Sequence, residues 1–172
     1  MPHCRISKIV WCIGWTMTGF SLIAAAAPPG WKTVASPKRL TRTASAIERN
    51  GGAQCTIAVP LAMVEDTEAD RTLGQTGHMK TPDGNLTVSV QEHPPGESLT
   101  RAKDVAMMFN GTARPKEDTP QRVWLTYSRA GWTHWDIFVP GNPVVCSAHV
   151  SIKDARLDDA AISIIATLGP SK

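Results

Sequence analysis

Apolar and polar residues alternate most regularly between residues 122 and 151. Two turn signals divide this stretch, Arg129-Ala130-Gly131 and Pro140-Gly141-Asn142-Pro143. Glycine at the end of a three-residue loop suits a type I turn with a bulge, and the second loop has four residues. The pattern predicts a three-stranded antiparallel meander in which Leu125 faces Trp135 and Ile137 faces Cys146.

This register sorts the side chains of the meander onto two faces. The predicted core face consists of Val123, Leu125, Tyr127, Trp135, Ile137, Val139, Val144, Cys146, Ala148 and Val150. The other face is mixed and carries Trp124, Thr126, Ser128, Trp132, His134, Asp136, Phe138, Ser147, His149 and Ser151. On the mixed face the register places His134 directly across from His149, and Asp136 across from Ser147.

Helical spacing of apolar residues predicts two helices that flank the meander. The first covers residues 98–110, with Ser98 as its cap and an apolar stripe of Leu99, Ala102, Val105, Ala106 and Phe109. The second is capped by Asp158, ends at Gly169-Pro170, and has the stripe Ala161, Ile164, Ile165 and Leu168.

Turn residues divide the first half of the chain into short strands. Asn50-Gly51-Gly52 predicts an N-terminal hairpin within residues 40–60, with a helix as the alternative for its first run. Pro82-Asp83-Gly84-Asn85 precedes a strand that begins at Leu86. Residues 61–76 are expected to form a loop with one helical turn, and residues 111–121 a polar connection. The whole pattern predicts the α+β class: an antiparallel sheet of hairpin, further strand and meander, packed by two or more helices.

The first residues of the chain have the three parts of a secretory signal peptide. Arg5 and Lys8 give a basic start, residues 9–22 are mostly apolar, and residues 24–27 are alanines. We predict a signal peptide over residues 1–26 that is cleaved after Ala26. An uncleaved membrane anchor is the alternative, but the apolar run is short for a spanning helix. Residues 27–38 are then a coil lead-in and residues 39–172 a single α+β domain.

The net charge is low once the signal peptide is removed. The full chain has a net charge of +3, and the loss of Arg5 and Lys8 reduces it to +1. Nucleic-acid binding depends on a strong positive charge, so nucleic acid is not expected as a partner. Membrane contact is expected only transiently, through the signal peptide.

Two cysteines remain after cleavage, Cys55 and Cys146. An even pair in an oxidising compartment predicts one disulfide, and such a compartment is the periplasm or the exterior of the cell. Cys146 lies on the predicted core face. A catalytic thiol needs access and a lowered pKa, and an apolar face opposes both.

The mixed face contains the residues most capable of chemistry. His134, Asp136 and His149 are metal-ligating types, and Ser147 with His149 and Asp136 would make up a triad. A flat strand supplies neither a strained nucleophile turn nor an oxyanion hole. The sequence therefore predicts no catalytic residue, no metal and no cofactor.

The aromatic residues of the mixed face would be costly to leave in water as a patch. Either the C-terminal helix covers them, or they form a binding surface. The candidate binding face consists of Trp124, Trp132, His134, Asp136, Phe138 and His149.

The order of elements resembles a known fold. An N-terminal hairpin ends in Cys55-Thr56-Ile57-Ala58-Val59-Pro60, and a strand, a helix, a three-stranded meander and a closing helix follow. This order resembles the Mog1/PsbP-like α/β fold, which includes the DcrB-type envelope proteins of bacteria. The resemblance implies an antiparallel sheet packed by helices, and adaptor, chaperone or accessory roles that are mostly non-catalytic. It supplies no site residue, and the cysteine pair is not part of its pattern.

Three function classes follow from these observations. The first is an exported, non-catalytic periplasmic accessory protein that binds another envelope or secreted protein through a protein-binding surface. The alternative is an immunity or inhibitor protein that neutralises a toxic envelope-targeting enzyme, such as a secretion-system effector. The third class is a hydrolase or metalloprotein that uses His134, Asp136 and His149.

Overall fold

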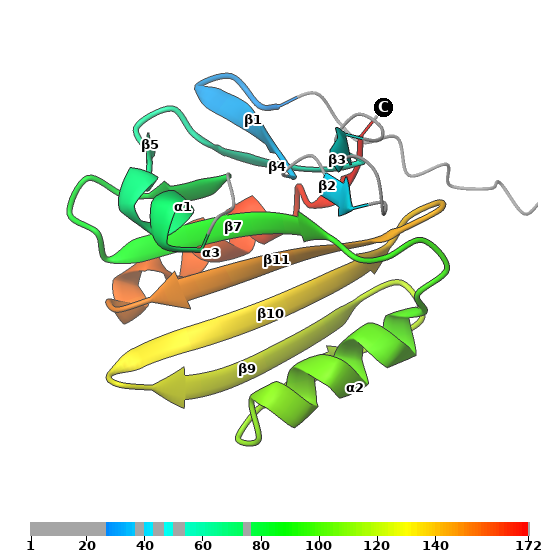
Figure 1. Ribbon diagram of the computed structural model, residues 1–172. Helices are drawn as coiled ribbons and strands as arrows, with labels where there is room; N and C mark the ends of the chain where they lie inside the picture. Colours follow the sequence, from blue (N-terminus) through cyan, green and yellow to red (C-terminus); the bar gives the residue numbers. More distant parts are fainter. Residues whose placement is uncertain (1–26, 37–39, 43–46, 50–53, 74–76, 172) are drawn as a thin grey trace, which may run out of the picture.

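A long antiparallel sheet forms the centre of the fold (Figure 1). The computed structural model describes residues 27–36, 40–42, 47–49, 54–73 and 77–171. Among these residues, seven strands follow the spatial order β5-β6-β7-β11-β10-β9-β8. Their bounds are Val64–Glu65 (β5), His78–Lys80 (β6), Leu86–Glu92 (β7), Arg114–Asp118 (β8), Val123–Arg129 (β9), Trp132–Pro140 (β10) and Val145–Ile152 (β11). The predicted α+β class is confirmed.

Shorter strands and helices complete the described part of the chain. The strands β1 (Trp31–Ala35), β4 (Cys55–Pro60) and β12 (Gly169–Pro170) form a small sheet in the order β1-β4-β12, and β2 (Leu40–Arg42) pairs with β3 (Ile47–Arg49). The helices are α1 (Thr67–Leu73), α2 (Leu99–Phe109) and α3 (Asp158–Ile165), the last preceded by the 3-10 turn η1 (Ala155–Leu157). None of these helices, within the residues described, is long and apolar enough to cross a membrane.

The predicted organisation of the N-terminal part is wrong in two respects. The segment expected as coil contains β1, where Val34 lies opposite Ile57 of β4. Proline and small residues on either side hide this short strand in the sequence, although Trp31 and Val34 pack against the core. The described partners of β4 are β1 and β12, so β4 does not form the expected hairpin with residues 40–49. The signal peptide at residues 1–26 and the turn at Asn50-Gly51-Gly52 lie outside the described residues.

The polar connection predicted at residues 111–121 contains β8. Its sequence, Arg-Pro-Lys-Glu-Asp, has no apolar residue because β8 is the edge of the sheet and most of its side chains are exposed. Proline and charged residues on an edge strand prevent it from pairing with other chains. Residues 61–76 likewise contain more structure than expected, namely β5 and α1.

The register of β9 against β10 differs from the prediction by one residue. Ala130 (φ 51°) and Gly131 (φ 80°) form a two-residue turn, so that Arg129 pairs with Trp132. Two successive left-handed residues are typical of a type I′ hairpin. An alanine at such a position is uncommon, so the sequence favoured a three-residue loop in which glycine alone adopts positive φ.

A shift of one residue exchanges the two faces of β9. Trp124 and Thr126 therefore lie on the same face as Trp135, whereas Val123, Leu125 and Tyr127 lie on the opposite face. The register of β10 against β11 differs from the prediction by two residues, with Val139 opposite Cys146. An even shift keeps the faces, so the side chains of β10 and β11 point where they were predicted to point.

Both faces of the long sheet are covered. We call the first the α3 face, since its cluster joins α3 and β4 to the sheet through Ile57, Val88, Val90, Trp124, Trp135, Ile137, Ala148, Val150, Ala161 and Ile164. The second is the α2 face, where Ala102 and Ala113 pack with Val123, Leu125, Phe138 and Val145. Figure 1 shows α2 lying along β9 and β10.

The predicted disulfide is present and joins the two sheets. Cys55 of β4 and Cys146 of β11 are bonded across 91 residues of chain, and both are 0% exposed. The bridge lies within the cluster of the α3 face. It therefore links the small sheet covalently to the centre of the long one.

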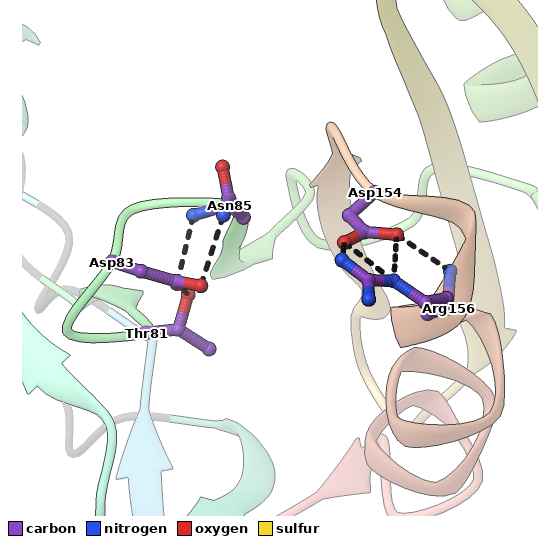
Figure 2. A network of polar contacts seen from close by, with 5 residues as sticks. All are labelled: Thr81, Asp83, Asn85, Asp154 and Arg156. Carbon is purple, nitrogen blue, oxygen red and sulfur yellow. Dashed lines mark hydrogen bonds and ion pairs between the residues drawn. The ribbon is translucent and has the colours of Figure 1, made fainter.

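The predicted turn between β6 and β7 is confirmed and is held by one carboxylate (Figure 2). Asp83 accepts hydrogen bonds from Thr81 Oγ1 at 2.6 Å and from Asn85 Nδ2 at 2.9 Å. These bonds lower the pKa of Asp83. The carbonyl of Asn85 accepts from Lys153 N at 2.9 Å, which connects this turn to the end of β11.

The helix caps are confirmed for α2 and wrong for α3. Ser98 Oγ accepts from Arg101 N at 3.1 Å, as an N-cap side chain does. Asp158 does not cap α3; instead Asp154 accepts from Arg156 N at 3.0 Å at the start of η1 (Figure 2). The Arg156 guanidinium also bonds to Asp154 and lowers the pKa of that carboxyl to about 2.

Candidate functional site

A polar cluster lies on the α2 face where β10 and β11 run side by side. The register places Asp136 opposite His149, and His134 opposite Ser151. His149 Nδ1 is 2.6 Å from Asp136 Oδ1, and His149 Nε2 is 3.1 Å from Ser151 Oγ. Ser151 Oγ is also 2.9 Å from His134 Nδ1. We call these four residues the His–Ser cluster, since one continuous chain of hydrogen bonds joins them.

Two neighbouring residues hold the ends of the His–Ser cluster. Asn110, which follows α2, donates from Nδ2 to Asp136 Oδ2 at 3.3 Å. Tyr127 stacks on His134 with ring centroids 4.9 Å apart and an interplanar angle of 17°. Burial and the negative charge of Asp136 raise the pKa of Tyr127 to about 12, so its hydroxyl stays protonated at neutral pH.

The direction of the hydrogen bonds of His149 follows from the carboxylate of Asp136. A carboxylate only accepts, so His149 Nδ1 donates to it. In the tautomer with its hydrogen on Nδ1, the other nitrogen, Nε2, is an acceptor. The Ser151 hydroxyl then donates to His149 Nε2. The direction of the contact between Ser151 Oγ and His134 Nδ1 depends on the tautomer of His134, which also bonds to the backbone of Arg129. In the tautomer of His134 with its hydrogen on Nδ1, this residue donates to Ser151 Oγ, and all three contacts have a donor and an acceptor.

The members of the His–Ser cluster differ in their access to solvent. Asp136 and Ser151 are each 9% exposed, whereas the side chain of His149 is 38% exposed. A ligand arriving from solvent therefore meets the His149 imidazole before it reaches Asp136 or Ser151. Burial, followed by the proximity of His149, lowers the pKa of His134 below its ordinary value of 6.5, so that His134 is neutral at pH 7.

The lowered pKa of His134 predicts a loss of stability in mild acid. The unfolded chain binds a proton at His134 more readily than the folded protein does, so the contribution of this residue is present above pH 6.5 and declines as the pH falls from there towards the folded-state pKa. Urea unfolding at pH 8, 7, 6 and 5 measures this decline. In His134→Phe, which keeps an aromatic ring beside Tyr127, the free energy of unfolding should depend less on pH than in the natural protein. An equal pH dependence in both proteins would contradict the assignment.

The structure places the predicted polar residues close together, but their cross-strand partners differ from the predicted ones. His134 and His149 are diagonal neighbours with ring centroids 5.4 Å apart, because the residue directly across from His149 is Asp136. Ser147 is not the partner of Asp136. Sequence reasoning placed Ser151 on this face but gave it no role. The available signal was its spacing of two from His149, since alternate residues of a strand share a face in any register.

The predicted aromatic binding face is wrong in its composition. Trp124 is 7% exposed on the α3 face, edge-on to Trp135 with ring centroids 4.9 Å apart. Phe138 is 4% exposed in the cluster of the α2 face, so the helix that covers it is α2 and not the C-terminal helix. Trp132 is half-buried and keeps part of its ring at the surface.

A second serine on the α2 face also bonds to a histidine. His93 Nε2 is 3.1 Å from Ser147 Oγ, and His93 Nδ1 is 3.5 Å from Glu97 Oε2. A cavity of about 160 Å³ lies between α2 and this part of the sheet. Its lining includes Ala102, Val105 and Ala106 of α2, and Phe138, Ser147 and His149 of the sheet. One wall of the cavity is thus an imidazole of the His–Ser cluster.

The chemistry of the candidate site is that of hydrogen-bonded imidazoles, a hydroxyl and a carboxylate. In the part of the chain that the structure describes, no group of three or more His, Cys, Asp or Glu side chains is placed to hold a metal ion. Neither a family model nor a curated protein matches the chain. The arguments about function therefore rest on the sequence and on the geometry of this α+β protein.

Proposed function

We propose that the chain is an exported, non-catalytic periplasmic accessory protein that binds another envelope or secreted protein. The basic start at Arg5 and Lys8, the apolar run over residues 9–22 and the alanines at residues 24–27 support export. The disulfide between Cys55 and Cys146 supports an oxidising compartment. The resemblance of the element order to the Mog1/PsbP-like fold supports an accessory role by analogy.

The observation that carries the binding proposal is an exposed apolar pair at the end of α2. Met108 is 72% exposed and Phe109 is 77% exposed, although the sequence predicted Phe109 in the buried stripe of this helix. The hydrogen bond from Asn110 to Asp136 holds this end of the helix beside the His–Ser cluster. Large apolar side chains at the surface, with polar groups beside them, are typical of a protein-binding surface.

Site-specific photo-crosslinking in the envelope of the native host tests this proposal. A photoreactive phenylalanine at position 109 is expected to trap one discrete partner, and Met108→Ala/Phe109→Ala is expected to lower the affinity for that partner at least about tenfold. Position 162 on α3 is the matched control, because Ile162 is also an exposed apolar residue, at 40%. No product at position 109, or the same products at both positions, would overturn the proposed surface.

The identity of the trapped partner separates an accessory protein from the immunity alternative. An immunity or inhibitor protein forms a tight 1:1 complex with an envelope-degrading enzyme and abolishes its activity. An accessory protein leaves the activity of its partner intact or increases it. Assaying the purified partner with and without the chain therefore decides between the two.

A further inference from the structure

We propose that Ser151, His149 and Asp136 form a hydrolytic site for short-chain carboxylic esters. This inference goes beyond the binding role proposed above, and its confirmation would replace the non-catalytic part of that role. It rests on the order of contacts: Asp136 Oδ1 to His149 Nδ1 at 2.6 Å, then His149 Nε2 to Ser151 Oγ at 3.1 Å. Orienting carboxylate, base and nucleophile are joined in the same order in serine hydrolases of unrelated folds.

The inferred hydrogen positions suit a nucleophilic role for Ser151. Its hydroxyl donates to His149 Nε2, which is the group that must accept the proton during attack. The second nitrogen of His149 is occupied by Asp136, which fixes the tautomer and stabilises the imidazolium that forms. Asn110 holds the other oxygen of Asp136 at 3.3 Å, so the orienting carboxylate is itself held in place.

With its hydrogen on Nδ1, a fourth side chain, His134, supplies what a flat strand lacks, a donor for the developing oxyanion. His134 Nδ1 is 2.9 Å from Ser151 Oγ. In a tetrahedral intermediate the oxyanion is bonded to the same carbon as Ser151 Oγ, which brings it within reach of this N–H. The stack of Tyr127 on His134, with centroids 4.9 Å apart, keeps the donor oriented before the substrate binds.

A cavity lies beside His149, the base of the proposed triad, and Ser151 is not one of its lining residues. It has a volume of about 160 Å³ and is bordered by Ala102, Val105, Ala106 and Phe138. Gln91, His93 and Ser147 also line it, and its small volume suits a short aliphatic chain better than a long one. The solvent-facing side of His149, whose side chain is 38% exposed, leaves room for the alcohol part of the ester.

The reaction proceeds in two balanced steps. Ser151 Oγ bonds to the ester carbonyl carbon while its proton passes to His149 Nε2. The bond from that carbon to the alcohol oxygen then breaks, and the alcohol leaves with the proton from His149. Water next attacks the acyl carbon, gives one proton to His149 Nε2, and the carboxylic acid is released as Ser151 Oγ recovers that proton.

Labelling and hydrolysis on the disulfide-bonded protein test the inference. A fluorophosphonate probe is expected to form one adduct, which peptide mass spectrometry places on Ser151. Hydrolysis of p-nitrophenyl butyrate should fall at least about 100-fold in Ser151→Ala and in His149→Gln, since general-base assistance contributes roughly this much. His134→Phe should lower kcat and leave KM nearly unchanged, because the oxyanion donor acts mainly in the transition state.

Ser89→Ala is the matched control. Ser89 is 5% exposed and lies directly opposite His149 on β7, so it is as buried as Ser151 and is also a neighbour of His149. This variant should keep both the labelling and the hydrolysis of the natural protein. Equal near-UV circular dichroism of all variants shows that they are folded. No adduct on Ser151, or hydrolysis by Ser151→Ala at the rate of the natural protein, would overturn the inference.

Discussion

Replacing both bridge cysteines by alanine is expected to lower the free energy of unfolding by about 4 kcal/mol. The bridge between Cys55 and Cys146 closes a loop of 91 residues, and closing so long a loop removes much of the conformational entropy of the unfolded chain. Both positions are 0% exposed, so the apolar surroundings favour alanine over serine in this test. Urea denaturation of Cys55→Ala/Cys146→Ala, measured against the oxidised natural protein, gives the difference.

Reduction provides the control for this experiment. A reductant should destabilise the natural protein and leave the double alanine variant unchanged, because only the former has a bond to break. A difference of less than about 1 kcal/mol would mean that the loop is already constrained in the unfolded ensemble, or that the bridge does not form.

Trp124→Ala is expected to cost about 3–5 kcal/mol of folding stability, the usual range for removing a buried tryptophan. Its ring is 7% exposed, meets Trp135 edge-on at 4.9 Å, and has the ammonium of Lys116 at 4.0 Å from its centroid. Truncation would leave a cavity next to Trp135 in the cluster of the α3 face. Thermal and urea unfolding measure the loss.

Trp132→Ala is the natural comparison. Trp132 belongs to the neighbouring strand and is half-buried, so its truncation should cost less than about 1.5 kcal/mol. The predicted register, with Trp124 on the same face as Trp132, would give similar losses at both positions. Equal effects of the two substitutions would therefore contradict the register of β9 described above.

The sequence predicts those elements of the fold whose two faces differ in polarity. The stripe over α3 and the alternation along β11 have one apolar and one polar side, and both were predicted correctly. β9 is apolar on both sides, because Trp124 packs against the α3 face and Leu125 against the α2 face. Such a strand does not determine its own register, and the turn at Ala130 adopts a backbone that alanine rarely adopts. β8 was missed because an exposed edge strand needs no apolar residue.

The candidate site was predicted in part. His134, Asp136 and His149 were assigned to one polar face because β10 and β11 alternate cleanly, and the structure has them there. Which of them lie directly across from each other depends on the register of β10 against β11. The predicted register was wrong by two residues, and so the predicted pairs were wrong as well. Asn110 was not foreseeable as a partner of Asp136, since their contact depends on where α2 ends above the sheet.

The unequal covering of the two sheet faces has a consequence for local opening. The α3 face contains the disulfide and the larger cluster, whereas α2 is held by the smaller cluster and has Ala102 as its buried residue. Amide hydrogens of α2 should therefore exchange through local fraying long before those of β7, β10 and β11. Each such opening withdraws the Asn110 amide from Asp136, so the order of one helix end is thermodynamically coupled to the hydrogen bonding of the His–Ser cluster.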